Sequence, residues 1–107
     1  MSDRIFEMHA EICRTLGSAV RIEILSALRD GEKTVNQLAE ALGLRQANVS
    51  QHLAVLRQRR VVATRKEGTN IYYKVANPKI IQACDLMRQV LLEQLKETEQ
   101  LTRIVGE

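Results

Sequence analysis

The chain has 107 residues, the length of one ordinary domain, and we expect a single domain over residues 1–107. Apolar residues make up 45% of it and aromatic residues only 3%, which leaves little material for an aromatic ligand pocket or a row of base-stacking side chains. The apolar runs are short and the first residues have mixed charge, so the sequence predicts no membrane span and no signal peptide. We therefore expect a cytoplasmic protein whose two cysteines are reduced.

The net charge of +3 is distributed unevenly along the sequence. Residues 45–79 contain eight basic residues and one acidic residue, a charge of +7, whereas the rest of the chain has eight basic and twelve acidic residues, a charge of −4. A contiguous basic segment is expected of a surface that binds nucleic acid. The alternative is an ordinary solvated basic surface.

Apolar residues at helical spacing predict four helices in the N-terminal part of the chain. Gly17 and Gly43 are typical residues for ending a helix, and Thr34 with Gln37 three positions later fits a capping box at a helix start. The predicted helices cover residues 4–16, 19–29, 35–42 and 46–59.

After these helices the apolar period changes from that of a helix to that of a strand. Residues 61–66 and 70–75 are rich in β-branched and aromatic side chains, and Gly68 between them can adopt a positive φ. This pattern predicts a β-hairpin with a polar, basic tip.

Pro78 then opens a last helix that we expect to extend to about residue 104. Its apolar stripe is longer than one small domain can cover, which indicates a homodimer. The residues that need a partner are Leu92, Leu95, Leu101, Ile104 and Val105.

The predicted elements form a mostly α fold with a small β-hairpin, an α+β winged helix-turn-helix. The helix-turn-helix covers residues 34–59 and the wing covers residues 61–76. A helix of this kind fits the major groove of DNA, and a basic wing can reach the adjacent backbone or minor groove. The candidate DNA-binding residues are small, polar or basic: Gln46, Ala47, Ser50, Gln51, His52, Arg57, Arg65, Lys66 and Thr69.

This region has two further interpretations. For His52, a phosphate contact or a structural hydrogen bond is favoured over metal ligation, because no second ligand lies one helical turn away. A winged-helix module that binds proteins instead of DNA is the alternative function. The sequence has no Ser-His-Asp or Cys-His arrangement and no phosphate-binding glycine loop, so we do not expect an enzyme.

The segment from Thr34 to Val75 resembles the DNA-binding core of the ArsR/SmtB-type repressors. The most specific matches are Val49-Ser50-Gln51-His52-Leu53 and the run from Arg65 to Tyr73, with Leu16 to Leu25 upstream. The resemblance implies a dimeric repressor that binds an inverted repeat in double-stranded DNA and releases it when an inducer binds. It also implies that the helices 4–16 and 78–104 form the dimer interface. Arg45 departs from the family, which commonly has a Ser or Thr cap there.

The resemblance does not supply an inducer site. The thiol pair of the family's arsenite, lead and cadmium sensors would fall near residues 34–38, which have no cysteine. The ligand clusters of its zinc sensors lie on the last helix and include histidine, but residues 78–107 have no histidine. Ser26 is at the position of the cysteine of persulfide-sensing relatives.

The remaining candidates for sensing are Cys13, Cys84 and His9, which lies one turn before Cys13. The two thiols could be ordinary core residues, or they could form a reversible disulfide or polysulfide. With His9 they could instead hold a thiophilic metal or metalloid ion such as arsenite. A repressor without thiol or metal sensing is therefore also an open interpretation.

Overall fold

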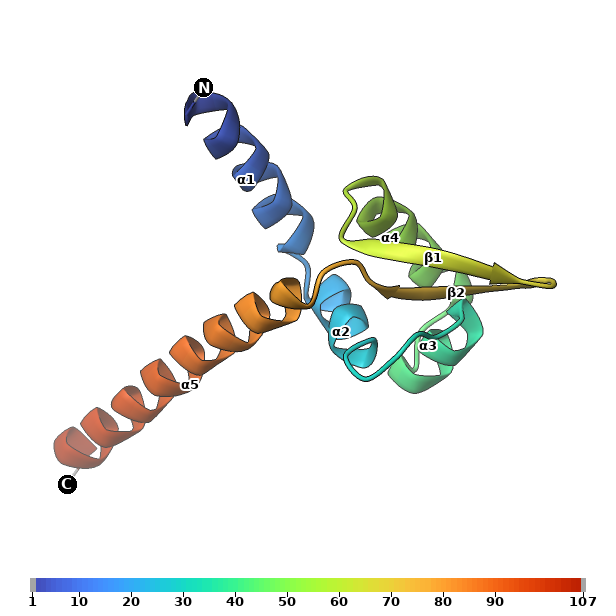
Figure 1. The fold of residues 1–107 in the computed structure, drawn as a ribbon. Helices are drawn as coiled ribbons and strands as arrows, with labels where there is room; N and C mark the ends of the chain where they lie inside the picture. Colours follow the sequence, from blue (N-terminus) through green and yellow to red (C-terminus); the bar gives the residue numbers. More distant parts are fainter. Residues whose placement is uncertain (1, 107) are drawn as a thin grey trace.

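A computed structural model describes residues 2–106, and the side chains of residues 3–100 and 103. In this part of the chain, four helices, a two-stranded antiparallel sheet and a long last helix follow one another (Figure 1). Their bounds are α1 Ser2–Leu16, α2 Ala19–Ala27, α3 Val35–Leu42, α4 Gln46–Gln58, β1 Val62–Glu67, β2 Asn70–Val75 and α5 Pro78–Gly106. The predicted winged helix-turn-helix fold is confirmed.

The core lies where α2, α3 and α4 pack against one another and against the start of the hairpin. α4 contributes Val49, Leu53 and Leu56, all fully buried, because their spacing places them on one side of the helix. Burying one such side chain contributes about 1.5–3 kcal/mol. This core fixes the orientation of α4, so its opposite side must face outward.

The two helices of the helix-turn-helix begin differently. At the start of α3, the Gln37 N–H donates to Thr34 Oγ1 at 3.2 Å and the Thr34 N–H donates to Gln37 Oε1 at 2.9 Å, which confirms the capping box. At the start of α4, Arg45 makes no side-chain capping hydrogen bond. Gly43 ends α3 with a φ of 65°, in the left-handed region that the turn requires.

Backbone hydrogen bonds connect α4 directly to the hairpin. Arg60 follows α4 with a φ of 62°, and the next N–H, that of Val61, donates to the Leu56 carbonyl at 2.8 Å. The Val61 carbonyl accepts from the Ala76 N–H at 2.9 Å, so one residue joins the end of α4 to the base of the wing.

The hairpin is also tied to the loop between α2 and α3. Its strands pair from Val62 opposite Val75 to Glu67 opposite Asn70, and Gly68 has the predicted positive φ, 62°. The N–H of Lys33 donates to the Tyr73 carbonyl at 3.0 Å, and the N–H of Tyr73 donates back to the Lys33 carbonyl at 2.8 Å. The wing is therefore held at its base and along one edge.

α1 and α5 leave this compact body in different directions, and the tip of the hairpin points away from both (Figure 1). Both helices carry exposed large apolar side chains. Those of α1 are Ile5, Phe6, Met8 and Ile12, and those of α5 are Leu86, Met87, Val90, Leu91, Leu92 and Leu95. The predicted contributions of Leu101, Ile104 and Val105 lie outside the described side chains. No helix in the described part of the chain is long and apolar enough to cross a lipid bilayer.

Candidate nucleic-acid interface

α4 presents its predicted base-reading residues to solvent. The side chains opposite the buried stripe of this helix are short or carry an amide or hydroxyl group, and all are exposed: Gln46, Ala47, Ser50, Gln51 and Ala54. Short side chains let the helix backbone approach the bases closely, and amides can both donate to and accept from base edges. The exposed side of α4 therefore has the chemistry of a recognition helix.

Arginines surround this side of α4, and the structure separates free ones from paired ones. Among the described side chains, Arg45, Arg57 and Arg60 are exposed and have no ion-pair partner. Arg59 is different, because its Nη2 lies 3.0 Å from Oε2 of Glu11 on α1. Three arginines around α4 thus remain available for phosphates.

Arg65 on β1, a candidate for contact with the DNA backbone or minor groove, is paired with two carboxylates in the structure. Its Nε and Nη2 donate to Oε1 of Glu32, in the α2–α3 loop, at 3.1 and 2.5 Å. Its Nη1 donates to Glu67 Oε2 at 2.8 Å, and its guanidinium carbon lies 4.7 Å from the centre of the Tyr72 ring. The hydrogen bond from Arg65 lowers the pKa of Glu32 below its usual value, and Glu32 and Glu67 together raise the pKa of Arg65. We call Arg65, Glu32 and Glu67 the wing cluster.

The other predicted wing residues are exposed near the hairpin tip. Lys66 follows Arg65 on β1 and has no ion-pair partner among the described side chains. Thr69 forms the two-residue turn with Gly68. Lys66, rather than Arg65, is the unpaired cation close to the tip.

His52 on α4 is half-buried and makes a structural hydrogen bond, one of the two roles that the sequence favoured. Its Nδ1 accepts from Nε of Arg21, on α2, at 3.2 Å. Sequence reasoning did not select Arg21, because 31 residues separate it from His52 and only the fold brings them together.

Comparison with known proteins agrees with this geometry. Residues 18–64 match the sequence model of the family described as bacterial regulatory protein, arsR family. The chain is 46% identical over 72 residues to the HTH-type transcriptional regulator KmtR of Mycobacterium tuberculosis, a match over 67% of this chain and 55% of KmtR. It is 31% identical over 88 residues to a biofilm growth-associated repressor of Xylella fastidiosa, covering 82% of this chain and 77% of the repressor.

The chain belongs to the ArsR family of bacterial regulatory proteins.

Solved structures of ArsR-family and related regulators share the fold. The homodimeric winged helix-turn-helix DNA-binding domain Mb0332 of Mycobacterium bovis is 28% identical, with a TM-score of 0.81 over 90% of this chain and 89% of that one. The transcriptional repressor BigR of Xylella fastidiosa is 31% identical, with a TM-score of 0.73 over 84% of this chain and 91% of that one. This ArsR-family protein is thus a DNA-binding transcriptional regulator and not an enzyme.

The predicted sensor residues of this ArsR-family protein do not come together within one chain. Cys13 is exposed near the end of α1, Cys84 is half-buried near the start of α5, and both are free thiols. His9 is exposed. Among the described residues, no three His, Cys, Asp or Glu side chains are grouped so that they could hold a metal ion. Cys13 is therefore not a core residue of a single chain, and Cys84 is only partly one.

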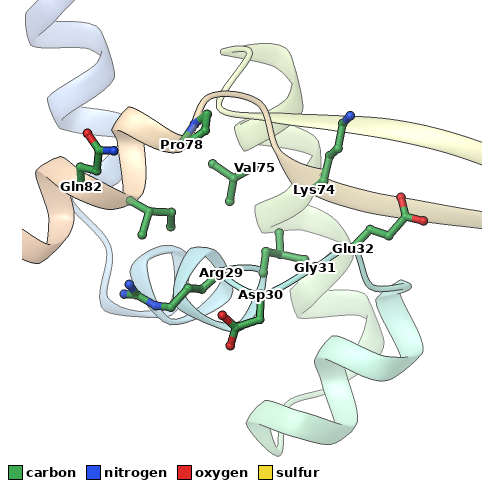
Figure 2. A pocket seen from close by; sticks show the side chains of 10 residues that line it. Arg29, Asp30, Gly31, Glu32, Lys74, Val75, Pro78 and Gln82 are labelled. Atoms are coloured by element: carbon green, nitrogen blue, oxygen red, sulfur yellow. The ribbon is translucent and has the colours of Figure 1, made fainter.

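A hollow of about 550 Å³ lies between the end of α2, the end of β2 and the start of α5 in this ArsR-family protein (Figure 2). Leu28, Val75 and Ile81 supply its apolar lining, while Figure 2 shows the charged ends of Arg29 and Lys74 directed away from its centre. A ligand site normally has polar groups that converge on the ligand. We therefore assign no ligand to this hollow.

Arg29, at the edge of this hollow, joins the segment that follows α2 to α5. Its Nη1 and Nη2 donate to Oδ2 and Oδ1 of Asp85 at 2.7 and 2.6 Å. This bidentate pair lowers the pKa of Asp85, and it adds a polar contact to the packing of Ile80 and Ile81 of α5 on the core.

Proposed function

We propose that this ArsR-family protein is a homodimeric repressor that binds an inverted repeat in double-stranded DNA in the cytoplasm. Each α4 enters a major groove and each wing contacts the adjacent backbone. The observation that carries this proposal is the exposed side of α4, which has short and amide side chains between the unpaired Arg45, Arg57 and Arg60. A dimer placed on a promoter in this way would block transcription by occupying it.

The exposed apolar side chains of α1 and α5 support the dimer. Met87, Leu91 and Leu95 are 62%, 53% and 65% exposed, and they follow one another at spacings of four residues on one side of α5. A continuous apolar stripe on a projecting helix is stabilised when another helix covers it. Since the related domain Mb0332 is homodimeric, a second copy of this chain is the occupant that we propose.

Salt dependence and two substitutions test the binding surface. Counting Arg45, Arg57, Arg60 and Lys66 in both protomers gives eight unpaired cations, so log K against log salt should fall with a slope of about −7. Gln51→Ala should reduce discrimination at one base pair in each half-site by about 1 kcal/mol, because a base-edge contact is lost. Lys66→Ala should weaken binding to all sequences equally and make the slope shallower by about 2 in the dimer. The measurement is fluorescence anisotropy on an operator selected from genomic fragments.

Unaltered binding of both variants would contradict the proposed surface. Absence of any salt-dependent binding by the wild-type protein would contradict the function itself and would favour the protein-binding alternative.

For the release of DNA we propose a thiol-mediated signal, taken up by Cys13 and Cys84 across the dimer. Both are free, and they lie on the two helices proposed to form the interface. Oxidants, persulfide donors and arsenite should release wild-type protein from its operator, whereas Cys13→Ser and Cys84→Ser should remain bound, as monitored by anisotropy. Equal release of wild type and both variants would leave a repressor without thiol sensing as the correct interpretation.

A further inference from the structure

Arg21 connects three helices of the structure. Its Nε donates to His52 Nδ1 on α4 at 3.2 Å, and its Nη1 donates to the Thr15 carbonyl in the last turn of α1 at 3.2 Å. Its own N–H, in the first turn of α2, donates to Oγ of the N-cap Ser18 at 3.4 Å. Thr15 itself is buried, with 4% exposed. One guanidinium therefore lies between a projecting helix and the recognition helix.

The stability of α2 does not explain why an arginine occupies its first turn. The N-terminus of a helix has a positive partial charge, so a cation in the first turn of α2 is electrostatically unfavourable. Long side chains on helices point back toward the N-terminus, which directs Arg21 toward the α1–α2 junction. The favourable contribution of Arg21 must come from the two acceptors that it meets there.

The contact with Arg21 determines where His52 carries its proton. A guanidinium only donates hydrogen bonds, so the Nδ1 that faces it must present a lone pair. With Nδ1 as the acceptor, the ring N–H of His52 is on Nε2. The other ring nitrogen is thereby made a hydrogen-bond donor.

The Nε2–H group is not fully buried. Among the described side chains, every fully buried nitrogen or oxygen atom has a hydrogen-bond partner. Nε2 of His52 has no such partner among them. Nε2 is therefore not a fully buried atom. At helical spacing His52 shares one flank of α4 with Asn48, four residues before it, and Arg45, seven before it. Arg45 is one of the unpaired arginines beside the recognition face, so this flank is where a DNA phosphate is expected.

We propose that Arg21 is a positioning residue for DNA binding. It holds His52 as the Nε2–H tautomer and orients that N–H to donate to a phosphate of the DNA backbone. Its second hydrogen bond, to the Thr15 carbonyl, fixes the guanidinium relative to α1. The inference rests on the proposed DNA-binding function and assigns to it a residue that does not itself touch the DNA.

A double-mutant cycle on the full-length protein tests the proposal. Arg21→Met keeps the aliphatic stem and removes both hydrogen bonds, and we expect it to weaken operator binding about fivefold to tenfold. His52→Ala should weaken binding by a similar factor, and adding Arg21→Met to it should weaken binding less than about twofold further. Arg14→Met is the matched control, because it removes one positive charge from the neighbouring α1 without any contact to His52. Its affinity should remain within about twofold of wild type.

The tautomer provides a second measurement that a merely structural role would not change. In ¹⁵N-labelled protein, the His52 nitrogen shifts should show a protonated Nε2 and an unprotonated Nδ1. Arg21→Lys keeps the charge but lacks the planar fork that reaches both acceptors, so a mixture of tautomers is expected while the thermal unfolding curve shows a folded protein.

The outcomes separate the inference from the function on which it rests. Suppose that the wild-type protein binds its operator. The role of Arg21 would be overturned if Arg21→Met did not change the affinity, or if Arg21→Met weakened binding by the same factor in the wild type and in His52→Ala. It would also be overturned if His52 kept the same tautomer in Arg21→Lys. Only failure of the wild-type protein to bind DNA would overturn the proposed function.

Discussion

Replacing Leu91 and Leu95 of α5 by glutamate is expected to produce a monomer whose operator affinity is lower by about a hundredfold or more. Both side chains are more than half exposed in a single chain, and both lie on the stripe that we propose a second copy covers. Burying glutamates there would place unpaired charges in an apolar interface. In the dimer, binding of one half-site holds the second protomer close to the other half-site. Monomers bind the two half-sites independently, so the operator affinity falls.

Analytical ultracentrifugation and anisotropy on the same samples measure this effect. The control is Gln82→Glu with Gln89→Glu, which adds two acidic residues to the same helix on the side away from Leu91. This control should remain dimeric and bind DNA with at most a small loss. A Leu91→Glu, Leu95→Glu variant that still sediments as a dimer would show that α5 is not the interface.

Substitutions in the wing cluster should change DNA affinity in opposite directions. Arg65→Ala removes a cation and leaves the carboxylates of Glu32 and Glu67 unpaired beside the DNA, so we expect affinity to fall about tenfold. Glu67→Gln should raise affinity about threefold, because Nη1 of Arg65 becomes available to a phosphate. The protein should remain folded in both cases, since Arg65 is 47% exposed.

Anisotropy at one fixed low salt concentration compares these variants. Glu97→Gln on α5 is the control for the change in net charge, and it should bind like wild type. If Arg65→Ala and Lys66→Ala had equal effects while Glu67→Gln had none, Arg65 would be acting as a free phosphate contact, as its position in the sequence suggested.

Local patterns explain how much of the fold could be predicted. Thr34 and Gln37 satisfy each other within four residues, and Gly68 needs only its own φ to form the turn, so both features are visible in the sequence. The buried stripe of α4 follows from helical spacing alone. These features sufficed for the order of the elements and for the exposed side of the recognition helix.

The interactions that modify the site connect distant parts of the chain, and for that reason they could not be predicted. Arg65 meets Glu32 from 33 residues away, and Arg29 meets Asp85 from 56 residues away. The basic segment 45–79 contains one acid of its own, but the fold adds Glu11 and Glu32 from the acidic remainder. A charge count along the sequence therefore overstates how many cations face the DNA.

The positions of the two thiols were also beyond sequence reasoning. Cys13 lies on an apolar stripe, which suggested burial, but α1 projects from the body and leaves that stripe uncovered in a single chain. Helical periodicity indicates which side of a helix is apolar, but it does not indicate whether the same chain covers that side.

The backbone hydrogen bonds of Val61 bear on how DNA binding could be regulated. The Val61 backbone joins α4 to the base of the wing, and the Lys33–Tyr73 hydrogen bonds join the wing to the loop before α3. Backbone hydrogen bonds thus connect the recognition helix and the wing into one DNA-binding unit. In the dimer that we propose, a signal that releases the DNA would act through α1 and α5, by changing the separation or tilt of the two DNA-binding units. The release that we propose would then depend on the spacing between half-sites and would leave each DNA-binding surface intact.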